Sequence, residues 1–365
     1  MIDTRLRKNL DWALVLFVLA IVVIGLATLY SASRDNPGRY FQKQLLWVVI
    51  GLGCMALGAT IDHARLPRFA GSFYLLTIFL LVLVMVVAQE VKGATRWIPI
   101  GSFQFQPSEF AKLMMIVCLA TYLTHRQERM HQIGTLVSSF VYVGVPALLI
   151  FKQPDLGTAL VLIAIWFGMT YIAGARVRHL VLFLAAGAAI FAGMWFAGVL
   201  KDYQKSRLVA FVNPRADPKE AGYHVLQSRI AVGSGQLWGK GFRHGTQVQG
   251  RFIPESHTDF IFTVLAEEGG FFASALVVLL YGGVLLRGTV TIAQAEDTLG
   301  RLLAAGIVSL FAFHVLENIG MTIGIMPVAG VPLPLFSYGG SAMLLNMAAV
   351  GVLVGIGMRR HGLVF

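Results

Sequence analysis

Two carboxylates and a histidine lie within five positions in the segment FIPESHTDF, residues 252–260. Glu255, His257 and Asp259 come directly before a long apolar stretch that suits a lipid bilayer. Burial beside lipid raises the pKa of a carboxyl group, which can then accept a proton from a substrate hydroxyl. Asp259 is therefore a candidate general base, with Glu255 and His257 as candidate substrate-binding residues. The structural alternative for Asp259 is an acid in the first turn of a helix, which the helix dipole favours.

A further pair of ionisable residues lies inside an apolar stretch. Glu109 and Lys112 are three residues apart, so on one helix they occupy neighbouring positions and can pair. Ionisable residues within membrane spans are costly and usually mark a functional pathway, which makes this pair a candidate binding site. A structural ion pair that braces two helices is the alternative. Glu317 is a similar intramembrane acid with His314 one turn earlier, and the sequence does not identify its partner.

Two other segments place polar side chains beside apolar stretches. Arg96 and Trp97 lie in KGATRWIPIG, residues 92–101, where Arg96 offers a forked donor to phosphate oxygens. An anchor at the membrane interface is the alternative interpretation of both residues. Asp155 in KQPDLGTA and Ser337 in PLFSYGG stand at the starts of later apolar stretches, and both join the candidate substrate-binding residues.

Membrane helices must position these side chains. The chain has 365 residues, of which 57% are hydrophobic and 13% charged, and its mean hydropathy is +0.73. Soluble domains carry about a quarter charged residues, so this composition indicates a membrane protein. We expect an all-α integral membrane protein with a single polytopic domain, residues 1–365. Ten stretches have about the length that a bilayer requires: 12–31, 45–61, 71–88, 109–124, 136–151, 156–174, 179–199, 259–286, 302–324 and 338–358.

The basic residues predict how these spans are oriented. With the N-terminus in the cytoplasm, most arginines of the short connections lie inside, among them Arg65, Arg126, Arg176 and Arg301, as the positive-inside rule requires. Ten spans put the C-terminus in the cytoplasm as well. One long extracytoplasmic loop, about residues 200–258, then joins spans seven and eight. Topology thus accounts for the net charge of +11, which does not indicate a nucleic-acid partner.

In this topology the even-numbered spans begin at the outer face, and their starts hold most of the unusual polar chemistry. Ser108, Asp155 and Thr258 are candidate N-caps, each accepting a hydrogen bond from a free amide of the first turn. Several helix N-termini directed at one surface also create a positive field that suits a phosphate or pyrophosphate. The four starts are FQPSEFAK (105–112), KQPDLGTA (152–159), PESHTDF (254–260) and PLPLFSYGGSA (332–342).

Several common catalytic motifs are missing from the sequence: a Walker motif, GxGxxG after a strand, HExxH and GxSxG. Cys54 and Cys118 both lie in apolar stretches, so we expect neither a disulfide framework nor a metal cluster. A reaction outside the cytoplasm needs a substrate that arrives already activated, such as a lipid-linked sugar pyrophosphate. Lys112, Arg96 or a divalent cation, Mg²⁺ or Mn²⁺, would neutralise the departing charge, although no protein-encoded metal site is evident.

The long outer loop has two recognisable parts. AGYHVLQSRIAVGSG, residues 221–235, has helical spacing of Val225, Ile230 and Val232 and is expected to lie along the membrane interface. The glycine-rich stretch 233–250 has no strand–helix setting, so it is not a phosphate-binding P-loop and is expected to be flexible. Loops of this length usually have a function, and both a mobile lid and a partner-docking surface are open.

Four motifs in this order resemble the SEDS family, named for shape, elongation, division and sporulation. They are RWIPIGSFQFQPSEFAK (96–112), QPDLGTAL (153–160), PESHTDFIFTVLAEEGG (254–270) and GVPLPLFSYGGSAM (330–343). The resemblance covers essentially the whole chain. MPVAGVPLPLFSYGG is closer to the elongation members, of the RodA type, than to the division members. Thr95 stands where the resemblance predicts a second arginine, which weakens a two-arginine phosphate clamp.

The resemblance implies a peptidoglycan glycosyltransferase of the bacterial plasma (inner) membrane that polymerises lipid II at the extracytoplasmic face. It implies that Asp259 is the essential catalytic residue and that Glu109 and Lys112 form a pair in a central cavity. Asp259 would activate the 4-hydroxyl of the acceptor N-acetylglucosamine. That oxygen would displace the polyprenyl pyrophosphate from the donor N-acetylmuramic acid in one inverting step, while Lys112 and Arg96 hold the donor phosphates. The implied partner is a class B penicillin-binding protein, which supplies transpeptidation.

Two other functions would use the same residues. A flippase for lipid II or another lipid headgroup needs intramembrane charges such as Glu109, Lys112 and Glu317, but it also needs polar residues on both faces. The candidate residues crowd the outer face, which favours the enzyme. A scaffold that only recruits a partner synthase would tolerate Asp259→Asn.

Overall fold

The computed structural model describes residues 9–33, 37–87, 96–101, 103–198, 202–214, 221–250, 252–253 and 255–359. Thr95 and part of the predicted 200–258 loop lie outside the described residues. Nearly all of the regular structure is helical, as predicted. The elements are α2 (Trp12–Ala32), α3 (Pro37–Thr60), η1 (His63–Phe69), α4 (Ala70–Val87), β1 (Ile98–Ile100), β2 (Phe103–Phe105), α5 (Pro107–Thr124), η2 (Gln127–Arg129), α6 (Ile133–Lys152), α7 (Leu156–Ile172), α8 (Val177–Phe196), α9 (Asp202–Val212), α10 (Ala221–Ser234), α11 (Thr246–Gln249), α12 (Ile261–Gln294), α13 (Thr298–Ile323) and α14 (Gly340–Met358).

Eight helices of the described part are long and apolar enough to cross a membrane, and the shorter α7 is also apolar. The chain is therefore an all-α, multi-pass membrane protein. The predicted span 109–124 corresponds to α5, which is not among the eight and carries Glu109 and Lys112 in its first turns. The total of ten crossings stays a prediction.

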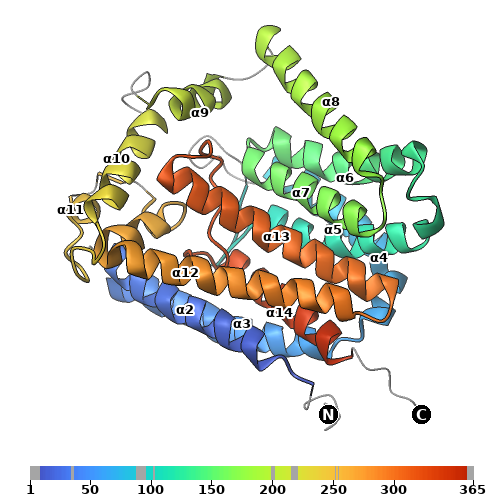
Figure 1. Cartoon of the computed structure of the whole chain (residues 1–365), viewed down its shortest axis with the longest axis horizontal. Helices are drawn as coiled ribbons and strands as arrows, with labels where there is room; N and C mark the ends of the chain where they lie inside the picture. Colours follow the sequence, from blue (N-terminus) through green and yellow to red (C-terminus); the bar gives the residue numbers. More distant parts are fainter. Residues whose placement is uncertain are drawn as a thin grey trace.

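The helix α13 runs through the middle of the bundle (Figure 1). It packs against α12, α7 and α5, while α14 packs along α3 and α12 also packs along α2. Trp166 of α7, Tyr281 of α12 and Phe311 of α13 are among the largest fully buried side chains. Because α5, α7 and α13 are enclosed by other helices, they can carry polar groups that contact with lipid would make costly.

The two ends of the described chain lie together at one end of the bundle. The Asn9 side-chain amide donates to the carbonyl oxygen of Met358 at 3.5 Å. Nearby, the Arg287 guanidinium pairs with the Asp11 carboxylate at 2.8 Å. The predicted topology requires the two ends to lie at the same end of the bundle, as Asn9 and Met358 do, while the side of the membrane stays a prediction.

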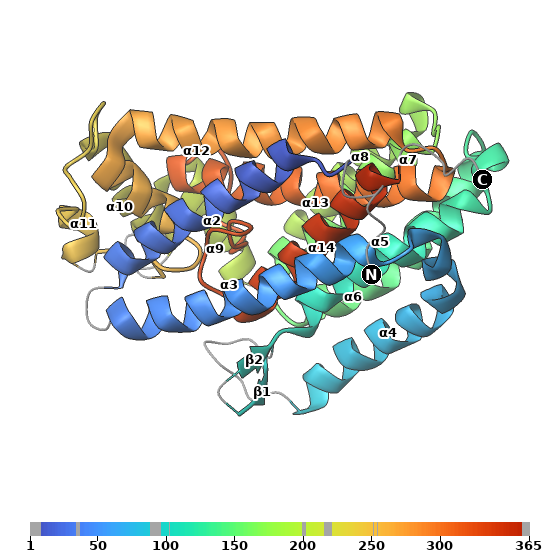
Figure 2. The same ribbon diagram turned by 90° about the horizontal axis from the view of Figure 1, so that it is seen from below.

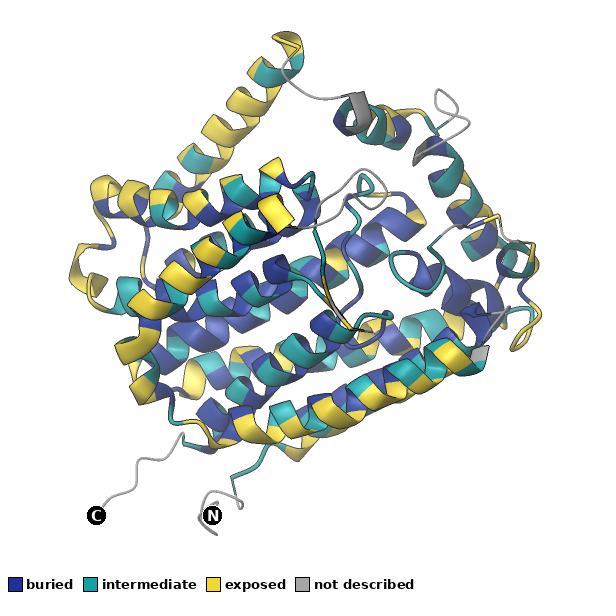
Figure 3. Ribbon diagram, turned by 180° about the vertical axis from the view of Figure 1, so that it is seen from behind, coloured by how far each residue is buried: buried dark blue, intermediate teal, exposed yellow. Residues whose placement is uncertain are grey.

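The helix α8 makes few contacts with the rest of the described chain. It packs mainly against α7, and Leu180 is its one buried residue. Figure 1 shows α8 leaning away from the bundle, and Figure 3 shows that most of its surface is exposed. An apolar helix with so little protein around it is suited to contact with lipid.

A short antiparallel β-hairpin, which the sequence did not predict, precedes α5 (Figure 2). Ile98 of β1 lies opposite Phe105 of β2. Gly101 occupies the turn with a φ of 61°, a conformation that glycine adopts without steric cost. The register of this pairing brings Trp97, just before β1, close to Gln106, just after β2.

The predicted span 259–286 is present as α12, with a backbone interruption that the sequence did not predict. The helix α12 runs from Ile261 to Gln294, but Gly270 has a φ of 68° and a ψ of −161°. A Cβ atom at this position would lie 2.3 Å from the amide nitrogen of Gly239. Glycine is therefore required by both the backbone angle and the close approach of a second segment.

That second segment belongs to the glycine-rich stretch 233–250, and the expectation that it is flexible is wrong. The amide of Lys240 donates to the carbonyl of Glu267 at 3.0 Å, and the amide of Phe271 donates to the carbonyl of Gln236 at 2.8 Å. Paired in this way, the stretch is docked against the start of α12. Three of its glycines, Gly235, Gly239 and Gly245, allow close packing against α12.

The fully buried carboxylate of Glu267 anchors the same loop. It accepts hydrogen bonds from the Lys240 ammonium at 2.7 Å, the Thr246 hydroxyl at 3.2 Å and the backbone amides of Gln247 at 3.0 Å and Val248 at 3.3 Å. Four donors, one of them a cation, compensate the cost of burying this charge. The carboxylate thereby fixes the loop that leads into the segment holding Asp259.

The predicted helix at 221–235 is present as α10. It packs against α12, α13 and α9. Val225 is buried in this contact, and the Ser228 hydroxyl lies 2.7 Å from the Thr263 hydroxyl. The outer segment is thus attached to the helical bundle through α10.

Candidate active site

The four polar helix starts meet at one place, beside the N-terminal end of α14. The amide of Gln106, before α5, donates to the Ser341 hydroxyl of α14 at 3.3 Å. The Gln106 side chain lies 3.5 Å from the carboxylate of Asp155, which precedes α7. The Ser337 hydroxyl donates to the carbonyl of Thr258, in the turn before α12, at 2.7 Å. The structure therefore links all four starts.

A cavity of about 680 Å³ lies among these starts. Its volume is within the range of about 300–1,000 Å³ that is usual for ligand sites. Lys112 and Ser337 are the two predicted site residues that do not line it. The other seven do: Asp259, Glu255, His257, Glu109, Asp155, Arg96 and Trp97.

Asp259 lies in the turn before α12, and its side chain is partly exposed to the cavity. Burial, together with the neighbouring carboxylate of Glu255, raises the pKa of Asp259 to about 6, against the opposing effect of Arg207 and Arg96. At neutral pH such a group is mostly ionised and is also a stronger base than an ordinary carboxylate. Both properties suit a general base.

The surroundings of Asp259 are fixed from the middle of α13. The side-chain amide of Asn318 donates to the carbonyls of Asp259 and Val331, each at 2.8 Å. Gly330 lies against the carboxylate, where a Cβ atom would be 3.4 Å from Oδ2 of Asp259. Two segments that are distant in sequence are thus held together around the carboxylate.

Glu109 and Lys112 form a buried ion pair with an Nζ to Oε1 distance of 2.6 Å. The ammonium also lies 3.1 Å from Nε2 of His314, whose Nδ1 lies 3.2 Å from the carbonyl oxygen of Pro332. Because Nδ1 faces an acceptor it carries the proton, and Nε2 accepts from Lys112. Glu109 reaches the cavity wall, whereas Lys112 lies behind it.

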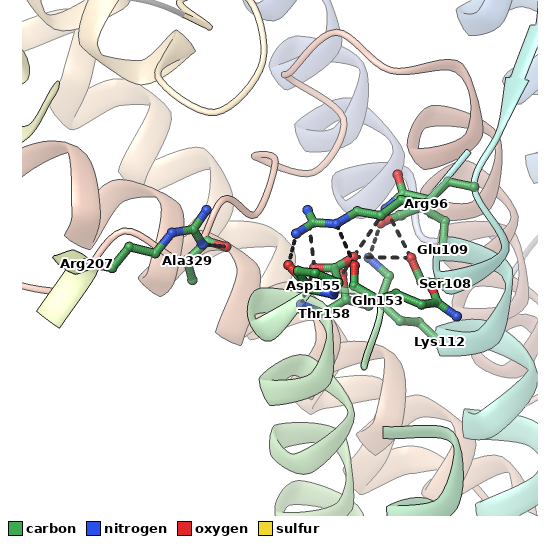
Figure 4. Close-up of polar contacts among 11 residues, drawn as sticks. Arg96, Ser108, Glu109, Lys112, Gln153, Asp155, Thr158, Arg207 and Ala329 are labelled. Atoms are coloured by element: carbon green, nitrogen blue, oxygen red, sulfur yellow. Dashed lines mark hydrogen bonds and ion pairs between the residues drawn. The ribbon is translucent and has the colours of Figure 1, made fainter. Parts of the chain in front are cut away.

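Arg96 is held by the turn that precedes α7, as Figure 4 shows. Its Nε donates to the carbonyl of Gln153 at 3.3 Å, a terminal nitrogen donates to the carbonyl of Pro154, and the other lies 3.8 Å from Oδ1 of Asp155. Asp155 is the N-cap of α7, as predicted, since it accepts from the amide of Thr158 at 3.3 Å. One carboxylate thus caps a helix and orients an arginine on the cavity wall.

The other two predicted N-caps are wrong. The N-cap of α5 is Gln106, because Pro107 at the first helical position starts the helix before Ser108. The N-cap of α12 is Phe260, and the Thr258 hydroxyl instead donates to the carbonyl of Glu255. Ser108 lies in the first turn of α5, where its hydroxyl is 3.5 Å from Oδ2 of Asp155.

Two further polar residues have structural partners. The Ser337 hydroxyl accepts from the amide of Leu333 at 2.9 Å in addition to its bond to the Thr258 carbonyl. Glu317, whose partner the sequence did not identify, accepts from the amide of Ala329 at 3.2 Å, while its Oε2 is buried with no hydrogen-bond partner. Both residues shape the 329–337 segment beside the cavity.

Arg207 lines the cavity although the sequence did not single it out. It lies on α9 and donates to the carbonyl of Ala329 at 3.2 Å (Figure 4), and its charge acts on Asp259. No motif marks this arginine. The usable signal was its position in a loop too long to be without function.

One face of α3 also contributes to the cavity. Tyr40, Lys43 and Trp47 line the wall at positions i, i+3 and i+7. This spacing on an otherwise apolar helix, with two aromatics and a cation on one face, is a signal that could have been found from the sequence.

The described residues contain no group of three or more His, Cys, Asp or Glu side chains placed to hold a metal ion. Two of the cavity carboxylates have protein partners instead: Glu109 pairs with Lys112, and Asp155 caps α7 and faces Arg96. No step of the reaction below is therefore assigned to Mg²⁺ or Mn²⁺.

Residues 9–362 match the family FTSW_RODA_SPOVE, which is described as cell cycle protein. The chain is 38% identical over 354 residues to the peptidoglycan glycosyltransferase MrdB of Escherichia coli K12, covering 97% of this chain and 95% of that one. It is 33% identical to the peptidoglycan glycosyltransferase RodA of Treponema pallidum, and the match covers 97% of this chain and 98% of that one.

Solved structures agree with these relatives. The chain superposes with a TM-score of 0.84 and 32% identity on a chain from a study of structural coordination of polymerization and crosslinking by a peptidoglycan synthase complex, covering 97% of this chain and 99% of that one. It also superposes on the rod shape determining protein RodA of Thermus thermophilus with a TM-score of 0.72 and 30% identity. This match covers 96% of this chain and 98% of that one.

Proposed function

The chain belongs to the family of cell cycle proteins that contains FtsW, RodA and SpoVE, and from this premise we propose how it acts. It is a peptidoglycan glycosyltransferase of cell elongation, which polymerises lipid II into β-1,4-linked glycan strands. The observation that carries the proposed mechanism is a basic carboxylate, Asp259, on the wall of a cavity that also presents Arg96 and Arg207.

Asp259 removes the proton from the 4-hydroxyl of the acceptor N-acetylglucosamine. The oxygen attacks C1 of the donor N-acetylmuramic acid, and the bond from C1 to the phosphate oxygen breaks. The electron pair leaves with the polyprenyl pyrophosphate, and the configuration at C1 inverts in this single displacement. A base with a pKa near the working pH contributes about 10²–10⁴-fold to such a step.

Arginines bind phosphate oxygens through pairs of parallel hydrogen bonds. Arg96 and Arg207 are the cations on the cavity wall that also act on Asp259, and we assign them the donor pyrophosphate. Lys112 lies behind Glu109, so we assign it a positioning role: it holds the Glu109 carboxylate at the wall.

The partner and the location follow from the same proposal. The related structure comes from a complex that couples polymerization to crosslinking. A class B penicillin-binding protein is accordingly the proposed partner of this chain, and it would supply the crosslinking. The proposed location is the bacterial inner membrane, with the cavity on the extracytoplasmic side, where the polymer is needed.

Reconstitution tests this function against the flippase alternative. The purified protein, in liposomes with its class B partner, is expected to convert labelled lipid II into glycan chains that a muramidase digests. Transfer of lipid II between leaflets without polymer would instead identify a transporter. The gathering of polar residues at one end of the bundle favours the first result.

A further inference from the structure

Three aromatic rings form one continuous part of the cavity wall. The ring centroids of Tyr40 and His257 are 5.0 Å apart, those of Tyr40 and Tyr338 are 5.1 Å apart, and those of His257 and Tyr338 are 5.9 Å apart. All three residues line the cavity and are partly exposed. The proposed mechanism uses none of them.

Hydrogen bonds join the segments that carry these rings before any ligand arrives. The buried side chain of Gln44, one turn from Tyr40 on α3, donates to the carbonyl of Ser337 at 3.1 Å and accepts from the amide of Gly339 at 3.2 Å. The amide of Tyr338 donates to the carbonyl of His257 at 3.0 Å. The aromatic wall therefore joins three separate segments into a preorganised surface.

The chemistry of this wall suits a sugar ring. The face of an aromatic ring carries partial negative charge, so it does not attract phosphate oxygens. A pyranose ring, in contrast, has a face of C–H groups that packs on aromatic rings and an edge of hydroxyls that reaches polar neighbours. A cavity that combines aromatic walls with a few placed polar groups is typical of such ligands.

The position of the wall relative to the base identifies which sugar it binds. His257 and Asp259 belong to the same turn, residues 255–260, and the base must contact the hydroxyl that attacks. We infer that Tyr40, His257 and Tyr338 form the subsite for the acceptor N-acetylglucosamine, an inference that rests on the proposed glycosyltransferase function. Lys43, one turn along α3 from Tyr40, lines the same cavity.

Two modified substrates separate this subsite from that of the donor. Lipid II with a blocked 4-hydroxyl can serve only as donor. A disaccharide-peptide that carries a carbon substituent at C1 in place of the pyrophosphate has no leaving group, so it can serve only as acceptor. Each of Tyr40→Leu and Tyr338→Leu is expected to raise the KM for the acceptor about three- to tenfold, the size of one lost aromatic contact. The donor KM stays unchanged.

Tyr40→Phe and Tyr338→Phe, which keep the ring, behave like the wild type, as does Tyr171→Leu at an exposed site outside the cavity.

The outcomes distinguish the inference from the function on which it rests. Failure of the wild-type protein to couple donor and acceptor would remove the proposed function. The subsite would be overturned if coupling occurs and Tyr40→Leu and Tyr338→Leu have the same acceptor KM as the control Tyr171→Leu. A rise in the donor KM of these variants, with no rise in the acceptor KM, would overturn it as well.

Saturation-transfer NMR on the wild-type protein gives a readout that does not depend on variant folding. Irradiation of aromatic protons is expected to transfer to H1, H3 and H5 of the N-acetylglucosamine in the acceptor-only compound. These protons share one face of the ring. Transfer to the peptide alone would contradict the inference.

Discussion

The charges around Asp259 are balanced so that its carboxyl group stays ionised but basic. Glu255 raises its pKa, whereas Arg207 and Arg96 lower it, and burial is the largest effect. A carboxylate surrounded by cations alone would be a weak base. The presence of Glu255 on the same turn therefore has a chemical consequence, beyond any contact with substrate.

This balance predicts opposite effects of two substitutions on the pH profile. Polymerisation by the wild type should rise with pH through about 6 as Asp259 loses its proton. Glu255→Gln removes a like charge, so the acidic limb should move to lower pH by about half a unit to one unit. Arg207→Gln removes a cation and should move it to higher pH. Initial rates of lipid II coupling between pH 4.5 and 8.5 measure both limbs, and movement of both in the same direction would contradict the assignment.

The sequence predicted those residues whose polarity contrasts with an apolar surrounding. Asp259, Glu109 and Asp155 stand out in this way, and all three line the cavity. Arg207 and Tyr40 do not, because arginine is ordinary in a basic loop and tyrosine is ordinary near a membrane interface. Their placement depends on contacts between segments that are far apart in sequence.

Among the helices and loops, the docked segment 233–250 shows why composition misled. The high glycine content predicted flexibility, yet Gly235, Gly239 and Gly245 all lie against α12 residues where a Cβ atom would come within 3 Å of another atom. A sequence shows that glycine is present but not which neighbour requires it. The interruption at Gly270 was missed for the same reason.

Loss of the Glu267 carboxylate is expected to release this segment. Glu267→Ala leaves the part-buried amide of Gln247 and the buried amide of Val248 without their acceptor, which costs about 1–3 kcal/mol for the buried group and less for the other. Hydrogen exchange of residues 240–250 should then accelerate by one order of magnitude or more, while exchange in α13 is unchanged. Glu128→Ala, at an exposed site in η2, is the control. Equal protection of 240–250 in both variants would show that the carboxylate does not anchor the loop.

Across the whole protein, hydropathy was a good guide to the bundle and a poorer guide to helix bounds. The helix α3 begins at Pro37, eight residues before the predicted span, because Arg39 and Lys43 lower the local hydropathy without breaking the helix. Hydropathy identified the helix α5 as the span 109–124, although the charges of Glu109 and Lys112 lower the hydropathy of its first turns. Apolar length decides where a chain can cross a membrane, whereas caps and local packing decide where a helix starts.

The predicted orientation can be tested with two single cysteines. In a background with Cys54 and Cys118 replaced by alanine, Trp238→Cys lies in the outer segment and Arg129→Cys in η2, and both sites are exposed. A membrane-impermeant maleimide added to intact spheroplasts should label the cysteine at 238 and not the one at 129. Both should react after the membrane is opened. The reverse labelling would place the cavity on the cytoplasmic side.

The role of Asp259 as the proton acceptor is tested most directly by a single-turnover measurement with Asp259→Asn. This substitution keeps the size of the side chain and removes its basicity. We predict that lipid II binds to the variant as to the wild type, and that glycosidic bond formation at pH 7.5 falls by about 10²–10⁴-fold. Coupling within a few-fold of the wild-type rate would contradict the mechanism.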